Sequence, residues 1–345
     1  MELYNYRERA IMRALSEDAS ASLSSLSKTA KCSRATVTRI LKRLTKEFGI
    51  KFTIELNDDA LGFTQRHLIA IKFGKEPSRS EIADAFKDDI YSSNIYLCKG
   101  DFDLLVQVRS NNSMDYIVWE SLLPGKLGDF KPKIYPSELM LTNFGYFPIS
   151  PEQITAMARN LNAKDIGMLS LLAQNSRIKM TALAKKLGIN RTTANYRLFS
   201  LRKANIIKKF TISINKPPKN YIIAYLVNYT FNKTSHIRSV RMMEYYKNYD
   251  EELPIMNSFS LLAPMSGSYR FFGMGAFEDR KTAINSAIKA HMRIFDKEEV
   301  SIKHAQVVAA IKGSYPFRNV DIKKEYTRFQ WNTEGNSINM TNFNK

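Results

Sequence analysis

The heptapeptide Lys51-Phe-Thr-Ile-Glu-Leu-Asn57 returns as Lys209-Phe-Thr-Ile-Ser-Ile-Asn215, and each copy follows a stretch with the pattern of a DNA-reading helix. Upstream of the heptads, Arg34 and Arg191 are 157 positions apart, and several leucine and threonine pairs share that offset. Such a period far exceeds the roughly 20 to 50 residues of a solenoid repeat, so each copy is a whole functional unit. The sequence therefore predicts a tandem duplication whose two units pair in space.

Length and charge bound the class of protein. The chain has 345 residues, which suffices for roughly two to four domains with proper cores. Its formal net charge is +19 and its pI is about 9.7. Such a field concentrates polyanions, of which nucleic acid is the commonest. The alternative interpretation is a lysine-rich proteome in which the charge has no function.

No pattern in the chain indicates metal binding or catalysis. Cys32 and Cys98 lack the spacing of a disulfide framework or a thiolate zinc site. There is no Gly-rich phosphate loop, no GxSxG elbow and no paired-carboxylate constellation. The histidines also lack metal-ligand spacing; they are His67, His236, His291 and His304. We therefore expect a protein that is not an enzyme, with no metal site and no cofactor.

The sequence favours a cytoplasmic protein with no membrane partner. Charged residues such as Glu2 and Arg7 occupy the region where the apolar run of a signal peptide would lie. The most apolar later stretch, 258–277, is interrupted by Pro264 and Arg270 and does not have the pattern of a spanning helix.

Residues 1–57 have the pattern of a winged helix-turn-helix. Two helical stretches come first, and Ser33 is then suited to cap a third helix. Gly49 ends that helix, and residues 52–56 alternate as a strand does. The third helix has a core stripe at helical spacing, made of Val37, Leu41, Leu44 and Phe48.

Residues 161–216 repeat this plan. Gly188 supplies a turn with positive φ where the first copy has Lys31, so the first turn is expected to be looser. Asn190 is suited to cap the third helix of this copy. Its buried stripe is predicted to contain Ala194, Leu198 and Leu201.

The two longer segments, 61–145 and 217–315, each have the order βαββαβ. The first segment has strands at 66–73, 95–99, 103–109 and 133–141 and helices at 80–88 and 114–123. The second has strands at 221–231, 256–262, 269–276 and 300–311 and helices at 237–249 and 280–295. The predicted fold class is α+β, with two winged helix-turn-helix domains alternating with two ferredoxin-like sandwich domains. Residues 146–160 are predicted as a linker and 316–345 as a frayed C-terminal tail.

Each unit resembles a regulator of the Lrp/AsnC family, in which a winged helix-turn-helix is joined to a βαββαβ domain. The strongest match is Lys99-Gly-Asp-Phe-Asp-Leu-Leu105, which is similar to the family's Gly-Asp-Phe-Asp turn. The resemblance covers the chain except the linker and the tail. It implies a transcription regulator whose sheets pair into dimers, here an internal pseudo-dimer that can assemble further. It also implies a small effector, often an amino acid, between paired sandwich domains.

The candidate DNA-binding residues lie on the third helix of each copy, because a helix fits the major groove and residues near its N-terminus reach base edges. Arg34 is suited to guanine and Asn195 to adenine, and the flanking lysines and arginines are suited to phosphates. The alternative interpretation is a solvated helix face. The full set is Ser33, Arg34, Thr36, Thr38, Arg39, Lys42 and Arg43 in the first copy, and Asn190, Arg191, Thr192, Thr193, Asn195, Tyr196 and Lys203 in the second. Lys46, Lys208 and Lys209 are further candidates for phosphate contacts.

Gly100, Asp101 and Asp103 are the candidates for an effector site in the first copy. An acidic turn of this kind either holds an amino group or caps its own hairpin. The second copy has Ser268 and Arg270 in place of the two acids, so it is expected to be degenerate.

Two other functions remain open from the sequence. Sirohaem decarboxylases resemble the same architecture and occur as fused pairs, but neither sandwich contains a compact His-rich motif. A nonspecific architectural DNA-binding protein is also compatible with the charge.

Overall fold

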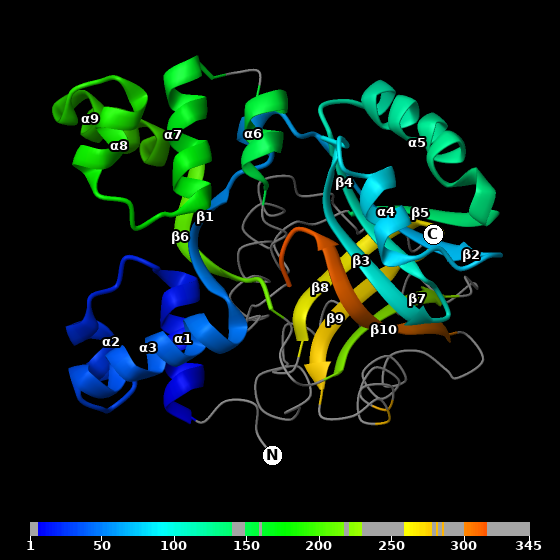
Figure 1. The fold of residues 1–345 in the computed structure, drawn as a ribbon, viewed down its shortest axis with the longest axis horizontal. Helices are drawn as coiled ribbons and strands as arrows, with labels where there is room; N and C mark the ends of the chain where they lie inside the picture. Colours follow the sequence, from blue (N-terminus) through cyan, green and yellow to red (C-terminus); the bar gives the residue numbers. More distant parts are fainter. Residues whose placement is uncertain are drawn as a thin grey trace, which may run out of the picture.

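The computed structural model describes residues 6–139, 149–158, 161–216, 221–229, 259–277, 281, 285 and 300–315. Two helical units lie on one side of the molecule and a β-barrel lies on the other (Figure 1). A two-stranded sheet runs between the helical units. The element order alternates helical units with sheet domains, which confirms the predicted α+β class.

The first helical unit consists of α1 (Tyr6–Glu17), α2 (Leu23–Thr29) and α3 (Arg34–Phe48). The Ser33 hydroxyl accepts a hydrogen bond from the Thr36 N–H at 3.2 Å, which confirms the predicted cap. Gly49 ends α3 in the left-handed conformation with φ 58°. The buried stripe of α3 differs by one position from the prediction: Ile40 is buried, whereas Leu41 is half-buried at the edge of the core.

The second helical unit consists of α7 (Ala163–Gln174), α8 (Met180–Leu187) and α9 (Arg191–Lys203). Asn190 Oδ1 accepts from the Thr193 N–H at 2.7 Å, as the sequence predicted. Ala194 and Leu201 are buried, and Leu198 packs against the same core from a half-buried position.

The stretch predicted as a linker contains a helix, α6 (Pro151–Met157). Ser150 and Gln153 form a reciprocal capping box at its start, and Pro151 stands in the first turn, where a missing N–H costs nothing. Ile154 and Met157 are buried in the core of the second helical unit. The prolines had suggested a linker, but here one of them marks a helix start.

The strand after each helical unit pairs with the strand of the other unit. β1 (Ile50–Leu56) runs antiparallel to β6 (Ile207–Ile214), and Thr53 lies opposite Thr211, its own counterpart in the duplication. The sequence predicted a short ribbon for each module. In the described residues the strand is present, but its partner comes from the other copy.

The contacts around this strand pair are reciprocal. Thr53 Oγ1 donates to the Ala173 carbonyl on α7 at 2.8 Å, and Thr211 Oγ1 donates to the Ser16 carbonyl on α1 at 2.8 Å. The N–H of Ser176 likewise donates to Phe52 O, and that of Ala19 to Phe210 O, both at 2.9 Å. Ser16 and Ala173 are equivalent positions at the offset of 157. Each strand therefore docks under the first helix of the opposite unit, as in a self-complementary dimer interface.

The first sheet contains β2 (Gln65–Phe73), β3 (Ser92–Gly100), β4 (Leu104–Ser110) and β5 (Pro132–Leu139), in the spatial order β3-β4-β2-β5. Asp59–Leu61 (η1) precedes the sheet, and Gly128–Phe130 (η2) precedes β5. α4 (Arg79–Ala85) and α5 (Ser113–Leu127) belong to the same domain. Trp119 and Leu123 of α5 share a core with Ile69 and Val106, so this helix covers one face of the sheet.

The second sheet contains β7 (Tyr221–Tyr229), β8 (Phe259–Gly267), β9 (Phe271–Phe277) and β10 (Val300–Lys312). Their spatial order is β8-β9-β7-β10, which is equivalent to that of the first sheet. The four strands confirm the predicted order of strands in this segment. The predicted helix at 237–249, nearly all of that at 280–295, and the tail 316–345 lie outside the described residues.

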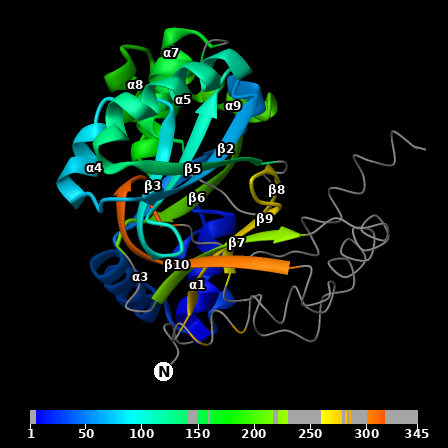
Figure 2. The same cartoon turned by 90° about the vertical axis from the view of Figure 1, so that its right-hand side faces the viewer.

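The two sheets close into one barrel, because β10 pairs with β3 and β5 pairs with β8. Figure 2 shows β7 and β10 running side by side within it. Apolar side chains from both sheets, among them Leu105, Leu226 and Met274, join one core. One face of each sheet is therefore buried against the other sheet.

Candidate nucleic-acid interface

The exposed face of α3 is basic. Arg34, Arg39, Lys42 and Lys46 are exposed, and Thr38 is half-exposed with its hydroxyl donating to the Arg34 carbonyl at 3.0 Å. Thr36 is half-buried and its hydroxyl lies 3.0 Å from that of Ser33, so both residues serve the cap. Arg34 and Arg39 therefore stand free of the α3 core near the helix N-terminus, where a recognition helix reads bases.

The exposed face of α9 has a different chemistry. Arg191, Thr192, Asn195 and Lys203 are exposed, and Thr193 is half-buried beneath the cap. Tyr196 is 70% exposed. Phe199, which the sequence analysis did not single out, is 63% exposed on the same helix. Its position could have been found by applying the offset of 157, which places Phe199 opposite Lys42 of the first copy.

The turn before each recognition helix has the same geometry in both units. Lys31 adopts the left-handed conformation at φ 48°, close to the φ 61° of Gly188. Cys32 donates its N–H to Ser27 O, and Ile189 donates to Ala184 O, both at 3.1 Å. The expectation that the first turn is looser is therefore wrong. Its hydrogen bonds hold a lysine in a conformation that glycine adopts more readily.

Two residues predicted to contact phosphates are held by carboxylates. Arg43 forms ion pairs with Glu8 of α1 and with Glu47, the latter at 3.8 Å. Lys209 lies 3.3 Å from Glu17 and 3.7 Å from Glu55. These side chains join elements within the helical part, and their positive charges are partly neutralised there.

The second helical unit is strongly basic in sequence. Between Gln174 and Lys216 the chain contains no aspartate or glutamate. Most of its basic side chains are exposed, and they include Lys185, Lys186, Arg202, Lys203 and Lys208. Arg197 is an exception, since it pairs with Asp165 at 2.9 Å. A cationic surface therefore surrounds α9.

The acidic turn of the first sheet makes contacts within the fold. Asp103 accepts from the Lys72 ammonium at 2.7 Å and from the Phe73 N–H at 2.8 Å. Asp101 accepts from the N–H of His304 on β10 at 2.8 Å. Gly100 adopts φ 154° and packs against the backbone of β10, where a side chain would collide with it. These contacts support the capping role that was weighed against effector binding, and they place the turn at the seam between the two sheets.

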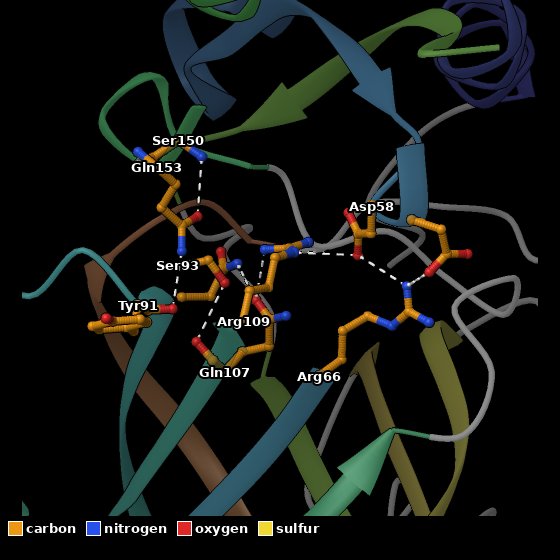
Figure 3. Close-up of polar contacts among 10 residues, drawn as sticks. Asp58, Arg66, Tyr91, Ser93, Gln107, Arg109, Ser150 and Gln153 are labelled. Atoms are coloured by element: carbon orange, nitrogen blue, oxygen red, sulfur yellow. Dashed lines mark hydrogen bonds and ion pairs between the residues drawn. The ribbon is translucent and has the colours of Figure 1, made fainter. Parts of the chain in front are cut away.

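A buried polar cluster joins the helical part to the first sheet (Figure 3). Arg109 on β4 is 2% exposed, and it donates to Asp58 at 3.2 Å and to Gln107 Oε1 at 3.0 Å. Asp58 stands between β1 and η1, and it also lies 3.7 Å from Arg66. The cluster thus connects the end of β1 to the barrel. No sequence motif marks this cluster, because its members are dispersed along the chain.

The histidines in the described residues have structural surroundings. His67 is buried and stacks on Tyr116 with ring centroids 3.6 Å apart. Burial lowers the pKa of His67 to about 4. His304 lies at the seam, 3.4 Å from Asp101. His236 and His291 lie outside the described residues. Among the side chains that the structure describes, no group of three or more His, Cys, Asp or Glu is arranged to hold a metal ion.

No helix in the described part of the chain combines the length and the apolar character needed to cross a bilayer. Cys32 and Cys98 are both free thiols.

A family of known proteins matches this chain in its two helical units. The family described as winged helix-turn-helix DNA-binding matches residues 4–47 and again 161–208. An HTH-type transcriptional regulator of Pyrococcus furiosus, itself uncharacterized, is 48% identical over 59 residues, which is 17% of this chain and 39% of that relative. The HTH-type transcriptional regulator FL11 of Pyrococcus abyssi is 32% identical over 108 residues, which is 31% of this chain and 70% of FL11.

Similarity over nearly the full length is found among solved structures. The crystal structure of the siroheme decarboxylase NirDL has a TM-score of 0.55 and is 11% identical, covering 95% of this chain and 99% of that protein. At this identity the similarity concerns the fold alone.

The duplicated helix-turn-helix and the two paired four-stranded sheets are those of a helix-turn-helix regulator. Together with the similarity to FL11, they show that this chain belongs to the Lrp/AsnC family, with two units fused in one chain.

Proposed function

We propose that this protein is a sequence-specific DNA-binding transcription regulator that acts as an internal pseudo-dimer. The reciprocal exchange of β1 and β6 carries the proposal, because it joins two helix-turn-helix units into one body. Covalent fusion replaces association of two chains with an effective concentration of millimolar order. Both recognition helices are therefore presented together even when the protein is scarce.

Each recognition helix would enter a major groove. Modules that read successive grooves on one face of the duplex require centres about 34 Å apart, or a multiple of that spacing on bent DNA. Arg34 and Arg191 would contact base edges, while exposed lysines such as Lys42 and Lys203 would contact phosphates. Because α3 and α9 expose different side chains, the two half-sites should differ in sequence.

The experiment that tests this proposal begins with selection of duplexes from a random pool by the full chain. Dissociation constants for the selected site and for random duplex are then compared at several salt concentrations. A regulator should prefer its site by a factor of about 10³ or more, and both affinities should fall steeply with salt. Equal affinity for selected and random DNA would instead identify a nonspecific architectural protein.

Single changes of Arg34 and Arg191 to Ala distinguish base contacts from phosphate contacts. Each should cost about 1 to 3 kcal/mol at the selected site and much less on random duplex. Lys46→Ala is a matched control, because Lys46 is exposed on α3 far from its N-terminus and is a candidate phosphate contact, so its loss should weaken binding to both duplexes alike. Equal losses on all sequences would assign the two arginines to the DNA backbone.

The proposal includes regulation by a small effector, such as an amino acid, at the seam between the sheets. The position of the Gly100 turn against β10 supports this part of the proposal, since a ligand bound there would contact both units. Thermal unfolding of the full chain with each of the common amino acids tests this part. A bound effector should raise the melting temperature in a concentration-dependent way. An Asp101→Asn variant should reduce that response, and a response that this variant leaves intact would remove the turn from the site.

A further inference from the structure

Two large aromatic side chains stand exposed in the middle of the α9 surface. Tyr196 is 70% exposed and Phe199 is 63% exposed, three positions further along the helix. Residues at this spacing lie on the same side of a helix. Asn195 lies one turn before Phe199 on that side, whereas Ala194 and Leu201 face the core. The two rings together form a small apolar patch within an otherwise polar face, which is able to contact an apolar group of a partner.

This aromatic pair belongs to one copy only. The offset of 157 places Arg39 opposite Tyr196 and Lys42 opposite Phe199. Both counterparts are exposed on α3. The backbone of the two recognition helices is therefore the same, but the chemistry presented by their central positions has changed from cationic to aromatic.

The surroundings of the pair favour a polyanion as its partner. Exposed lysines and arginines lie on α8, on α9 and at the start of β6, and no acidic residue occurs between Gln174 and Lys216. Duplex DNA presents one apolar group in its major groove, the C5-methyl group of thymine. Phosphate groups are charged, so an exposed phenylalanine would make no favourable contact with the DNA backbone alone.

We propose that Phe199, together with Tyr196, contacts thymine methyl groups, so that the half-site under α9 is distinguished by its thymines. The half-site under α3 would be read through Arg34 and Arg39. Asn195 is placed to pair with an adenine beside those thymines. The inference rests on the proposed function, since it assigns base preference to one of its two recognition helices.

Replacement of thymidine by deoxyuridine tests this inference, because it removes the methyl group and keeps the base pairing. The full chain is titrated with its selected duplex, with the same duplex carrying deoxyuridine under α9, and with one carrying it under α3. The half-site under α9 is assigned by DNA cleavage from an iron chelate attached to Lys203→Cys in a Cys32→Ser background. Each contacted methyl group lost under α9 should weaken binding about threefold to tenfold, and each lost under α3 less than twofold.

A matched variant makes the two helices alike at the decisive position. Phe199→Lys reproduces Lys42 of the first copy, and the exposed position keeps the fold intact. This variant should lose the part of the deoxyuridine effect that Phe199 provides and keep only the part that Tyr196 provides, while Lys42→Ala should leave the deoxyuridine effect unchanged. Equal deoxyuridine effects in both half-sites, no effect at all, or an effect that is undiminished in Phe199→Lys would each overturn the inference.

The outcomes separate this inference from the proposed function. A chain that does not distinguish selected from random duplex contradicts the regulator itself. A chain that binds its site specifically but is indifferent to deoxyuridine contradicts the thymine contact alone. If Phe199→Lys left DNA binding unchanged but altered the mass measured by analytical ultracentrifugation, the aromatic pair would belong to a contact between copies of the chain, and the inference would be wrong.

Discussion

The two sheets of the barrel have equivalent strand orders, but at the end nearest the helical units the first sheet has charged and polar side chains and the second has apolar ones. Aligning the Gly100 and Gly267 hairpins places Arg66, Gln107 and Arg109 opposite Ile222, Met274 and Ala276. Asp58, which Arg109 binds, corresponds to Lys216. The first unit thus buries a charged cluster where the second has mainly apolar residues.

This difference shows at which positions the two copies must retain the same structure. The strand pair β1–β6 is self-complementary, so each copy must present the same hydrogen-bonding edge to the other. The ends of the sheets and the exposed faces of α3 and α9 meet no counterpart in the described residues, and there the copies have diverged. The same backbone therefore supports two different helix surfaces and two different sheet ends.

The largest effect should come from breaking the buried cluster of the first unit. In the described residues, Arg109→Met leaves Arg66, at 3.7 Å, as the charged partner of the Asp58 carboxylate, and it should lower the free energy of unfolding by about 3 kcal/mol or more. Denaturant unfolding measures this change. Removing both charges, as in Asp58→Asn with Arg109→Met, should cost clearly less. Lys216→Met is the matched control in the second unit, where an exposed lysine should matter by about 0.5 kcal/mol or less. A loss below 1 kcal/mol for Arg109→Met would show that the cluster is not stabilising.

The second comparison concerns His67, which corresponds to Ile223 in the second sheet. Its pKa is about 4 in the folded protein and 6.5 when unfolded, so the unfolded state binds the proton more strongly. Stability should fall by about 3 kcal/mol as the pH falls from 6.5 to 4, and this loss should be absent above pH 6.5. His67→Ile makes the two sheets alike at this position and should flatten that part of the profile. The free energy of unfolding is measured across this pH range in the original protein and in the His67→Ile variant. If the two stability profiles are parallel, the loss of stability belongs to other groups.

Symmetry predicts equal effects at the centre of the exchanged strands. Thr53→Val and Thr211→Val each remove one reciprocal hydrogen bond and should each cost about 1 kcal/mol of unfolding free energy. The informative quantity is the difference between the two variants, which should be within about 0.5 kcal/mol. A large inequality would mean that one unit depends on the exchange more than the other.

The smallest effect should come from exchanging the turn residues. Lys31→Gly gives the first turn the residue of the second and relieves a left-handed lysine, so it should stabilise the protein by at most about 1 kcal/mol. Gly188→Lys should destabilise by a similar amount. Thermal unfolding of the two variants measures both shifts, and shifts of the same sign would contradict the account.

Much of the fold could be predicted because its signals are local. Helix caps at Ser33 and Asn190, the stop at Gly49 and the alternation of the sheet strands depend on neighbours in the chain. The helix at Pro151 was missed, since a proline beside polar residues is compatible with both a linker and a helix start. The candidate recognition surfaces followed from helical periodicity, but Phe199 was overlooked until its exposure was known.

The sequence by itself determined the duplication, the order of the elements and the position of both recognition helices, because repetition and periodicity are written along the chain. Only the tertiary structure decided that β1 pairs with β6, that Arg43 and Lys209 serve ion pairs, and that Asp58 meets Arg109. These contacts join residues that no local pattern relates. Strand partners and buried charge pairs are selected by which surfaces are brought together when the two units close on each other.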